Sequence, residues 1–310
     1  MKILSHLKKG AVRSLKAWKG VLVIWFLIFI LISLVVLPVR SGFKSMIGSS
    51  MITELLTESI NADVITDLLQ GVRSLMPVLK SGFLLIILMG FFMNAFLTGG
   101  IFSILGNKNN NHSISHFFAG GASNFWSVLV INLMVTLIFI VTVSILGGIP
   151  ALIVTGSGTP EPGSMGKVIR ISMIIMALLL PVILLVADYA RAWQVVHDSK
   201  KPFKAIGFGF SRSFKTFLVS YPVMLILVLI QSGFGALVMS NLLTSKPATG
   251  GGVFLLFLSS QILFFLRLML RVWRYGSVTS LMEDTATKLP EPANIKSVSP
   301  DQSVLDAEPL

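Results

Sequence analysis

The sequence predicts an all-α fold, a polytopic membrane helical bundle of about six transmembrane helices. The mean hydropathy is +0.85, and only 12% of the 310 residues are charged, against roughly 25% in soluble domains. Six apolar runs also approach or exceed the roughly 20 residues that a helix needs to cross a bilayer. A soluble protein of this length could not bury so many apolar side chains, whereas lipid can surround them.

The six predicted spans differ in how clearly they are bounded. The first could be a signal peptide, but its apolar run is too long for one and no small-x-small cleavage motif follows it, so we interpret it as an uncleaved anchor. Asn94 interrupts the second span and Arg267 the sixth. The expected spans are Val21–Val39, Gly82–Leu97, Phe125–Leu146, Ile171–Ala190, Phe217–Leu243 and Gly252–Leu270.

The distribution of lysine and arginine predicts that both termini are cytoplasmic. With the N-terminus inside, 17 of the 25 lysines and arginines fall in cytoplasmic segments and seven in outer segments. Positive residues concentrate on the cytoplasmic side of membrane proteins, beside anionic lipid headgroups. We therefore interpret the net charge of +12 as lipid contact and predict no binding to nucleic acid.

Three segments share one order of residue types and predict an internal repeat. Residues 10–24, 117–131 and 206–220 each place small or basic residues first, then an aromatic residue, then the start of a span. The second and third align at an offset of 89, and the first and second at an offset of 107. We expect three units, each an elbow helix followed by a helical hairpin. The alternative is that the three segments are not repeats, because interfacial segments before a span are commonly basic and aromatic.

The repeat gives the expected domain organisation. An integral membrane domain occupies residues 1–275, with repeat units at about 5–100, 112–191 and 200–275. Residues 276–310, rich in proline and polar side chains, predict a disordered cytoplasmic tail. Apolar residues at helical spacing within 43–80 predict two amphipathic outer helices, which form a lid or partner site or pack on the bundle.

Each elbow is expected to lie in the headgroup plane. In the first, a cationic face that includes Lys8, Lys9 and Lys16 opposes an apolar face that includes Leu15 and Trp18. A helix of this kind places its lysines on lipid phosphate and its aromatic ring at the boundary. Residues 200–215 repeat the pattern, so membrane lipids with anionic headgroups are the predicted partners at the cytoplasmic face, together with an unidentified protein partner.

Charged residues inside the bilayer require a partner, because hydrocarbon does not solvate them. Asp188 and Arg191 lie one helical turn apart, so a local pair is possible. Arg267, Arg271 and Arg274 recur on one face of the sixth helix. Our hypothesis is that Asp188 pairs with Arg267 or Arg271 across the bundle. The alternative is that all of these groups extend separately to headgroups.

Four amide side chains lie in four different predicted spans. They could line a polar pathway through the membrane. The alternative is that they form interhelical hydrogen bonds, worth roughly 0.6 kcal/mol each. These residues are Asn94, Asn132, Gln231 and Gln261.

Catalytic and metal-binding patterns are missing from the sequence. It contains no HExxH, P-loop or GxSxG motif and no cysteine, and no carboxylates are paired within the spans. His112 and His116 are four residues apart, but no carboxylate or thiol lies near them in sequence. We therefore expect no enzyme activity, no cofactor and no metal.

Three strings carry a resemblance to a known group of proteins. They are NAFLTGGIF at Asn94–Phe102, HFFAGGASNFW at His116–Trp126 and DYAR at Asp188–Arg191. Over roughly residues 15–275 the chain resembles uncharacterised bacterial six-span membrane proteins. It is more distantly similar to the membrane domain of some glycerophosphodiester phosphodiesterases, whose hydrolase domain this chain lacks. The resemblance implies a bacterial inner membrane but no activity.

Two glycine pairs within these strings predict close helix packing. Gly99 and Gly100 end the second span, and Gly120 and Gly121 lie in the second elbow. Small residues allow two backbones to approach where helices cross.

Two functions fit these features. The first is a transport or permease-like subunit for a lipid or another amphiphile, favoured by the hairpin repeats and the basic segment 188–216. The second is a non-catalytic scaffold whose elbows and outer helices organise lipid or partner proteins.

Overall fold

The fold is described by a computed structural model that covers residues 2–48, 62–107, 113–150, 152, 164–197, 200–245 and 249–286. All regular structure in these residues is helical, which confirms the all-α prediction. In chain order the elements are α1 (Lys2–Lys16), α2 (Trp18–Gly48), α4 (Ala62–Gly106), α5 (Ile114–Ser123), α6 (Phe125–Val143), the short π-helix η1 (Ser144–Gly148), α8 (Ser164–His197), α9 (Pro202–Lys215), α10 (Phe217–Thr244) and α11 (Gly250–Ala286).

The helices have the length and composition of a multi-pass membrane protein. In the part of the chain that the structure describes, five helical stretches are long and apolar enough to cross a membrane. A sixth is added when α1 and α2, which meet at 65°, are counted as one bent pair. The five stretches are Lys80–Gly106, Ile114–Gly148, Gly166–His197, Phe217–Thr244 and Gly250–Asp284.

The chain is built from three units, each a short elbow helix, a leading helix and a returning helix. The elbows are α1, α5 and α9, the leading helices are α2, α6 and α10, and the returning helices are α4, α8 and α11. One non-helical or bent residue separates each elbow from its leading helix: Ala17, Asn124 and Thr216.

The junctions correct the register predicted for the third unit. Ala17 and Asn124 are 107 residues apart, as the sequence alignment requires. Thr216, however, follows Asn124 by 92 residues and not by 89. The leading helix α10 therefore begins at Phe217, while Phe214 is an exposed residue of the elbow. Phe214 and Phe217 both fit the predicted order of small or basic residues, an aromatic residue and a span. The register based on Phe214 is wrong, because α10 begins at Phe217.

Each elbow packs across the returning helix of another unit. Elbow α5 crosses α4, elbow α9 crosses α8 and elbow α1 crosses α11, so that the three units close into a ring. Small residues occupy all three crossings. A Cβ added to Gly209 would lie 2.5 Å from the Val186 carbonyl oxygen, and one added to Gly276 would lie 2.9 Å from the Gly10 carbonyl oxygen. Glycine is required here because the backbones themselves are in contact.

Polar contacts reinforce the crossing of α1 and α11. Lys9 Nζ lies 3.2 Å from both carboxylate oxygens of Asp284, and Arg13 Nη2 donates to Glu283 at 2.5 Å. The buried His6 ring lies 2.9 Å from the Ser280 hydroxyl. The elbow nearest the N-terminus is thus tied to the helix nearest the C-terminus.

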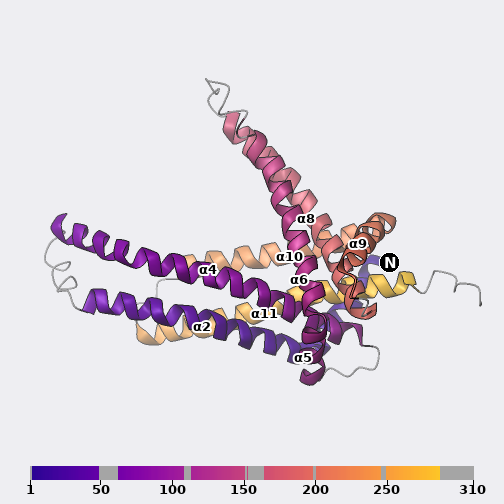
Figure 1. Ribbon diagram of the computed structural model, residues 1–310, viewed down its shortest axis with the longest axis horizontal. Coiled ribbons are helices and arrows are strands. Elements are labelled where there is room, and N and C mark those ends of the chain that lie inside the picture. Colours follow the sequence, from indigo (N-terminus) through magenta and orange to yellow (C-terminus); the bar gives the residue numbers. More distant parts are fainter. Residues whose placement is uncertain are drawn as a thin grey trace, which may run out of the picture.

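Among the described residues, the buried core lies at one end of the bundle, which we call the elbow end. There the returning helices bury residues such as Phe102, Leu185 and Val272. Away from it, the α2/α4 and α6/α8 hairpins diverge (Figure 1). Phe83 and Leu84 of α4 are both 67% exposed. Exposed apolar arms of this kind are stable only where lipid surrounds them.

Two predicted boundaries differ from the structure. Residues 62–80 were expected to form a separate outer helix, but they are the first part of α4, which continues through Pro77 without a break. The expected disordered tail began at 276, but residues 276–286 extend α11. Val278 and Leu281 are buried there against the first elbow. Most of the first outer helix and the chain beyond 286 lie outside the described residues.

Candidate functional site

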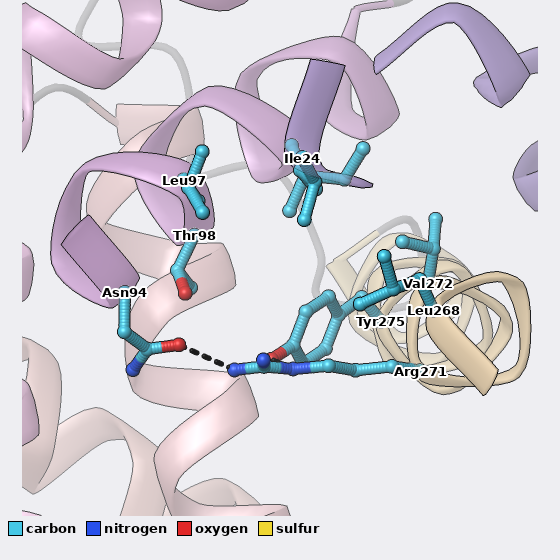
Figure 2. Close-up of a pocket in the computed structure, with 9 residues that line it drawn as sticks. Ile24, Asn94, Leu97, Thr98, Leu268, Arg271, Val272 and Tyr275 are labelled. Carbon is cyan, nitrogen blue, oxygen red and sulfur yellow. Dashed lines mark hydrogen bonds between the residues drawn. The ribbon is translucent and has the colours of Figure 1, made fainter. Parts of the chain in front are cut away.

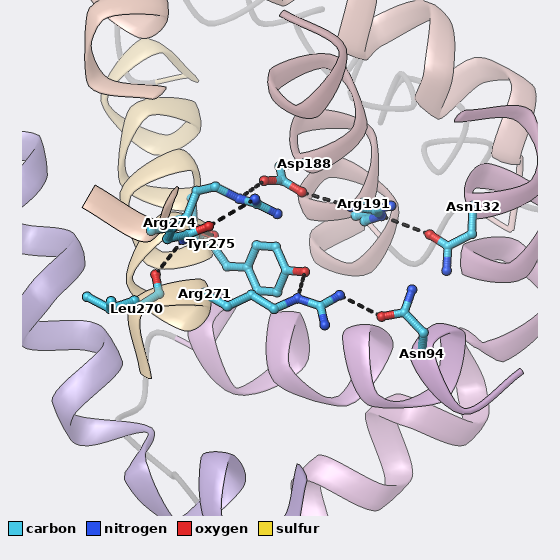
Figure 3. Close-up of polar contacts among 10 residues, drawn as sticks. Asn94, Asn132, Asp188, Arg191, Leu270, Arg271, Arg274 and Tyr275 are labelled. Carbon is cyan, nitrogen blue, oxygen red and sulfur yellow. Dashed lines mark hydrogen bonds and ion pairs between the residues drawn. The ribbon is translucent and has the colours of Figure 1, made fainter. Parts of the chain in front are cut away.

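A polar cluster lies inside the elbow end, where the three returning helices meet (Figure 3). Asp188 of α8 is fully buried, and Arg191 and Arg274 are 8% and 7% exposed. Apolar residues of the core surround the cluster, so its charges lie in a medium of low dielectric constant. Charges in such a place persist only when other groups compensate them.

Asp188 binds two arginines at once. Arg191 donates from Nη1 to Oδ1 at 2.8 Å, and Arg274 donates from Nε to Oδ2 at 2.8 Å. The local pair with Arg191 was one of the predicted possibilities. The hypothesis that Arg267 or Arg271 is the partner across the bundle is wrong, because Arg274 holds that position. Arg274 lies about 4.5 Å nearer the elbow end than Arg271, at the level of Asp188 on α8.

Arg271 instead reaches α4 and has only neutral partners. Its Nη2 donates to Asn94 Oδ1 at 2.5 Å, and its Nε donates to the Tyr275 hydroxyl at 2.7 Å. The Tyr275 ring lies between two guanidinium groups, with Cζ of Arg271 5.6 Å and Cζ of Arg274 5.1 Å from its centre. This ring spreads cation–π attraction over both charges, but it does not neutralise them.

Three of the four predicted amides belong to this cluster. The Asn132 carbonyl oxygen accepts from Arg191 Nε at 3.0 Å. Gln231 donates from Nε2 to the Leu270 carbonyl oxygen at 2.8 Å, and its own carbonyl oxygen lies 3.5 Å from Arg274 Nη1. Gln261 lies ten residues before Arg271 on α11, so the cluster does not include it. The amides therefore hold the guanidinium groups in place.

Asn132 also leaves a donor unused. Its side chain is 3% exposed, and its Nδ2 is buried with no hydrogen-bond partner among the described residues. A buried donor without an acceptor costs about 1–3 kcal/mol. This amide therefore favours an acceptor group next to Arg191.

A small cavity lies beside Arg271 (Figure 2). Its volume is about 20 Å³, and its polar lining comes from Asn94, Thr98, Arg271 and Tyr275. Apolar residues of α2, α4 and α11 complete the wall. A cavity of this size holds one water molecule or one oxygen atom of a larger ligand.

Arg267 is separate from this hydrogen-bonded cluster. It is exposed on α11, one helical turn farther from the elbow end than Arg271. Among the described residues no carboxylate lies within ion-pair distance of it. In the part of the chain that the structure describes, α8 and α11 therefore place four arginines and one aspartate in or next to the cluster.

The predicted glycine contacts are present at the crossing of α4 and α5. A Cβ added to Gly100 would lie 2.7 Å from the Phe117 carbonyl oxygen, and one added to Gly121 would lie 3.0 Å from that of Phe96. Gly120 packs on the Ser103 side chain, and Gly99 lies against Gly120 and Gly121. These four residues position the elbow-end part of α4, which carries Asn94 and Thr98.

Sequence reasoning missed a second polar contact. The buried Tyr189 hydroxyl lies 2.7 Å from the Ser220 hydroxyl, which joins α8 to α10 next to Asp188. The tyrosine follows Asp188 directly in the sequence, but serine and tyrosine are too common in membrane helices to indicate the contact.

The assignment of partners predicts a specific coupling. We expect Asp188→Asn and Arg274→Gln to be non-additive, with an interaction energy of about 0.5–3 kcal/mol, because the two side chains are in direct contact. Asp188→Asn and Arg267→Gln should be additive. Unfolding of the detergent-solubilised single and double variants measures both terms, and additivity in the Asp188–Arg274 cycle would contradict the assignment.

Comparison with protein-family models, with curated proteins and with solved structures finds no match to this chain. The geometry of the described residues therefore carries the functional argument.

Proposed function

We propose that this chain is a non-catalytic integral membrane protein that binds an anionic lipid or another anionic amphiphile, as a transport or permease-like subunit. The observation that carries the proposal is the excess of arginine over carboxylate in the cluster. Arg191 and Arg274 share one carboxylate, that of Asp188, while Arg271 beside them has only neutral partners.

The excess charge supports an anionic ligand on energetic grounds. Burying an unpaired ion costs several kcal/mol even after the protein relaxes. Arg271 has two neutral acceptors, and Asn132 has a spare donor close to Arg191. An anion close to these groups would compensate the charge of Arg271 and accept from guanidinium groups in charge-assisted hydrogen bonds.

We further infer that the elbow end faces the cytoplasm of a bacterial inner membrane. The described ends of the chain, α1 and the end of α11, contact each other, which fits an even number of crossings. Exposed lysines lie on two of the three elbows, including Lys8 and Lys16 of α1 and Lys204 and Lys215 of α9. Their position favours the cytoplasmic side.

Lipid binding by the purified protein tests the site. Native mass spectrometry with equal amounts of phosphatidylglycerol and phosphatidylcholine should show preferential retention of the anionic lipid. Arg271→Gln should reduce that preference about tenfold, because it removes one charge-assisted interaction. Arg170→Gln, a change of an exposed arginine at the far end of α8, is the matched control. Unchanged selectivity in Arg271→Gln would reject the site.

A scaffold function is the second candidate, and the elbows favour it. Each elbow exposes large apolar residues: Leu15 at 63%, Ile114 at 47% and Phe214 at 63%. Together with the elbow lysines these residues form an amphipathic surface suited to the headgroup plane. If Lys8→Gln and Lys16→Gln together abolish the preference for anionic lipid while Arg271→Gln does not, the scaffold function is correct.

A further inference from the structure

Two arginines of α11 differ from Arg191 and Arg274 in having no acidic partner among the described residues. Arg191 and Arg274 share the carboxylate of Asp188. Arg271 bonds only to an amide and a phenol, and Arg267 has no carboxylate within ion-pair distance among the described residues. Arg267 and Arg271 therefore add two positive charges that no carboxylate of the described residues neutralises, beyond the one left over where Arg191 and Arg274 share Asp188.

Arg267 and Arg271 also lie close together. They are four residues apart on a continuous helix, so their side chains project from one face about 6 Å apart. One helical turn before Arg271 lies the exposed Arg267, and one turn after Arg271 lies the buried Arg274. The charged face thus runs from the lipid-accessible part of the helix into the polar cluster.

The surroundings of Arg267 are apolar. Leu266, its neighbour on α11, is 44% exposed, and Ile262, five residues earlier on the same helix, is 56% exposed. Away from the elbow end, the α6/α8 hairpin diverges from the α2/α4 hairpin (Figure 1). An exposed arginine at such a depth is costly unless an anion or water reaches it. The chains of a lipid would cover the apolar side chains while its headgroup meets the arginine.

We propose that Arg267 and Arg271 bind the headgroup of a lipid that carries a phosphomonoester. This inference rests on the proposed function and narrows its ligand. A phosphomonoester carries a charge of about −1.5 to −2 at neutral pH and three terminal oxygens, whereas a phosphodiester carries −1 and two. Two guanidinium groups each offer a planar fork that matches phosphate oxygens. The dianion therefore matches the charges of Arg267 and Arg271, whereas a phosphodiester matches only one of them.

The small cavity completes the arrangement. Its volume of about 20 Å³ accommodates one phosphate oxygen between Arg271 and Thr98, and the rest of the headgroup would remain outside it. Hydrogen bonds from Arg271 to Asn94 and Tyr275 hold its guanidinium group in the wall of this cavity.

A lipid competition on the full-length protein tests this inference. The detergent-solubilised protein is presented with equal amounts of dioleoyl phosphatidic acid, phosphatidylglycerol and phosphatidylcholine of the same chains, and bound lipid is counted by native mass spectrometry. Phosphatidic acid should be retained about tenfold over phosphatidylglycerol. Arg267→Gln should bring that ratio close to one without loss of fold, because Arg267 is exposed. Arg170→Gln is again the control and should leave the ratio unchanged.

The outcomes separate this inference from the proposed function. Equal retention of phosphatidic acid and phosphatidylglycerol, with both above phosphatidylcholine, overturns the phosphomonoester assignment and leaves the anionic-lipid function standing. Failure to prefer either anionic lipid overturns both. Displacement of phosphatidic acid by inorganic phosphate at millimolar concentration shows that the site takes the free ion, which overturns the lipid assignment.

Discussion

Replacing Asp188 with asparagine is expected to destabilise the folded protein by about 3–5 kcal/mol, the typical cost of removing one partner of a buried ion pair. The carboxylate is fully buried and accepts from two arginines at 2.8 Å each. Asparagine keeps the shape but removes the charge, so Arg191 and Arg274 repel each other in the core. Thermal unfolding in detergent, followed by tryptophan fluorescence, measures the effect.

Asp284→Asn provides the matched control for this substitution. Asp284 also contacts a cation, but its side chain is 46% exposed and lies 3.2 Å from the exposed Lys9. An exposed ion pair contributes about 0–1 kcal/mol, so this variant should unfold near the wild-type temperature. If the two variants unfold at the same temperature, the buried cluster does not have the structural role assigned to it.

Gly100→Leu is expected to prevent formation of the folded bundle. Even a Cβ at this position would lie 2.7 Å from the Phe117 carbonyl oxygen, which belongs to the elbow backbone and cannot move aside as a side chain can. The cost should exceed the roughly 1–3 kcal/mol typical of overpacking, because α4 and α5 must separate. Gly10→Leu and Gly209→Leu should behave alike, since they lie at the equivalent crossings.

The monodisperse fraction after detergent extraction measures this effect. Gly207→Leu tests the same elbow as Gly209→Leu, and Gly90→Leu tests the same helix as Gly100→Leu. Neither control glycine has a neighbouring atom within 4 Å of the added Cβ. Both controls should therefore remain monodisperse. A monodisperse Gly100→Leu protein would show that the crossing tolerates a wider spacing than the structure has.

Much of the fold could be predicted because lipid imposes simple rules on sequence. Long apolar runs define the spans, and a basic, aromatic segment before a span defines an elbow. The end of α11 was missed because its polar residues, such as Ser277 and Ser280, are typical of a loop. They are buried only because α1 covers them, and no local signal reports that contact.

The composition of the candidate site could be predicted, but its pairing could not. Membrane helices contain few charges, so Asp188 and the arginines of α11 were evident as a set. Choosing Arg274 over Arg271 required the axial offset between α8 and α11, which depends on how three crossings fit together. Three residues along a helix correspond to an axial shift of only about 4.5 Å. The ends of apolar runs in a sequence do not locate one helix relative to another that precisely.

The ring of crossings has a consequence for assembly during synthesis. Elbows α5 and α9 each dock on the helix made just before them, whereas α1 docks on α11, some 270 positions later in the chain. A ribosome therefore releases the first elbow long before its binding surface exists. Until α11 inserts, Asp188 also lacks Arg274. Insertion of the final helix thus closes the ring and completes the ionic cluster in a single late event.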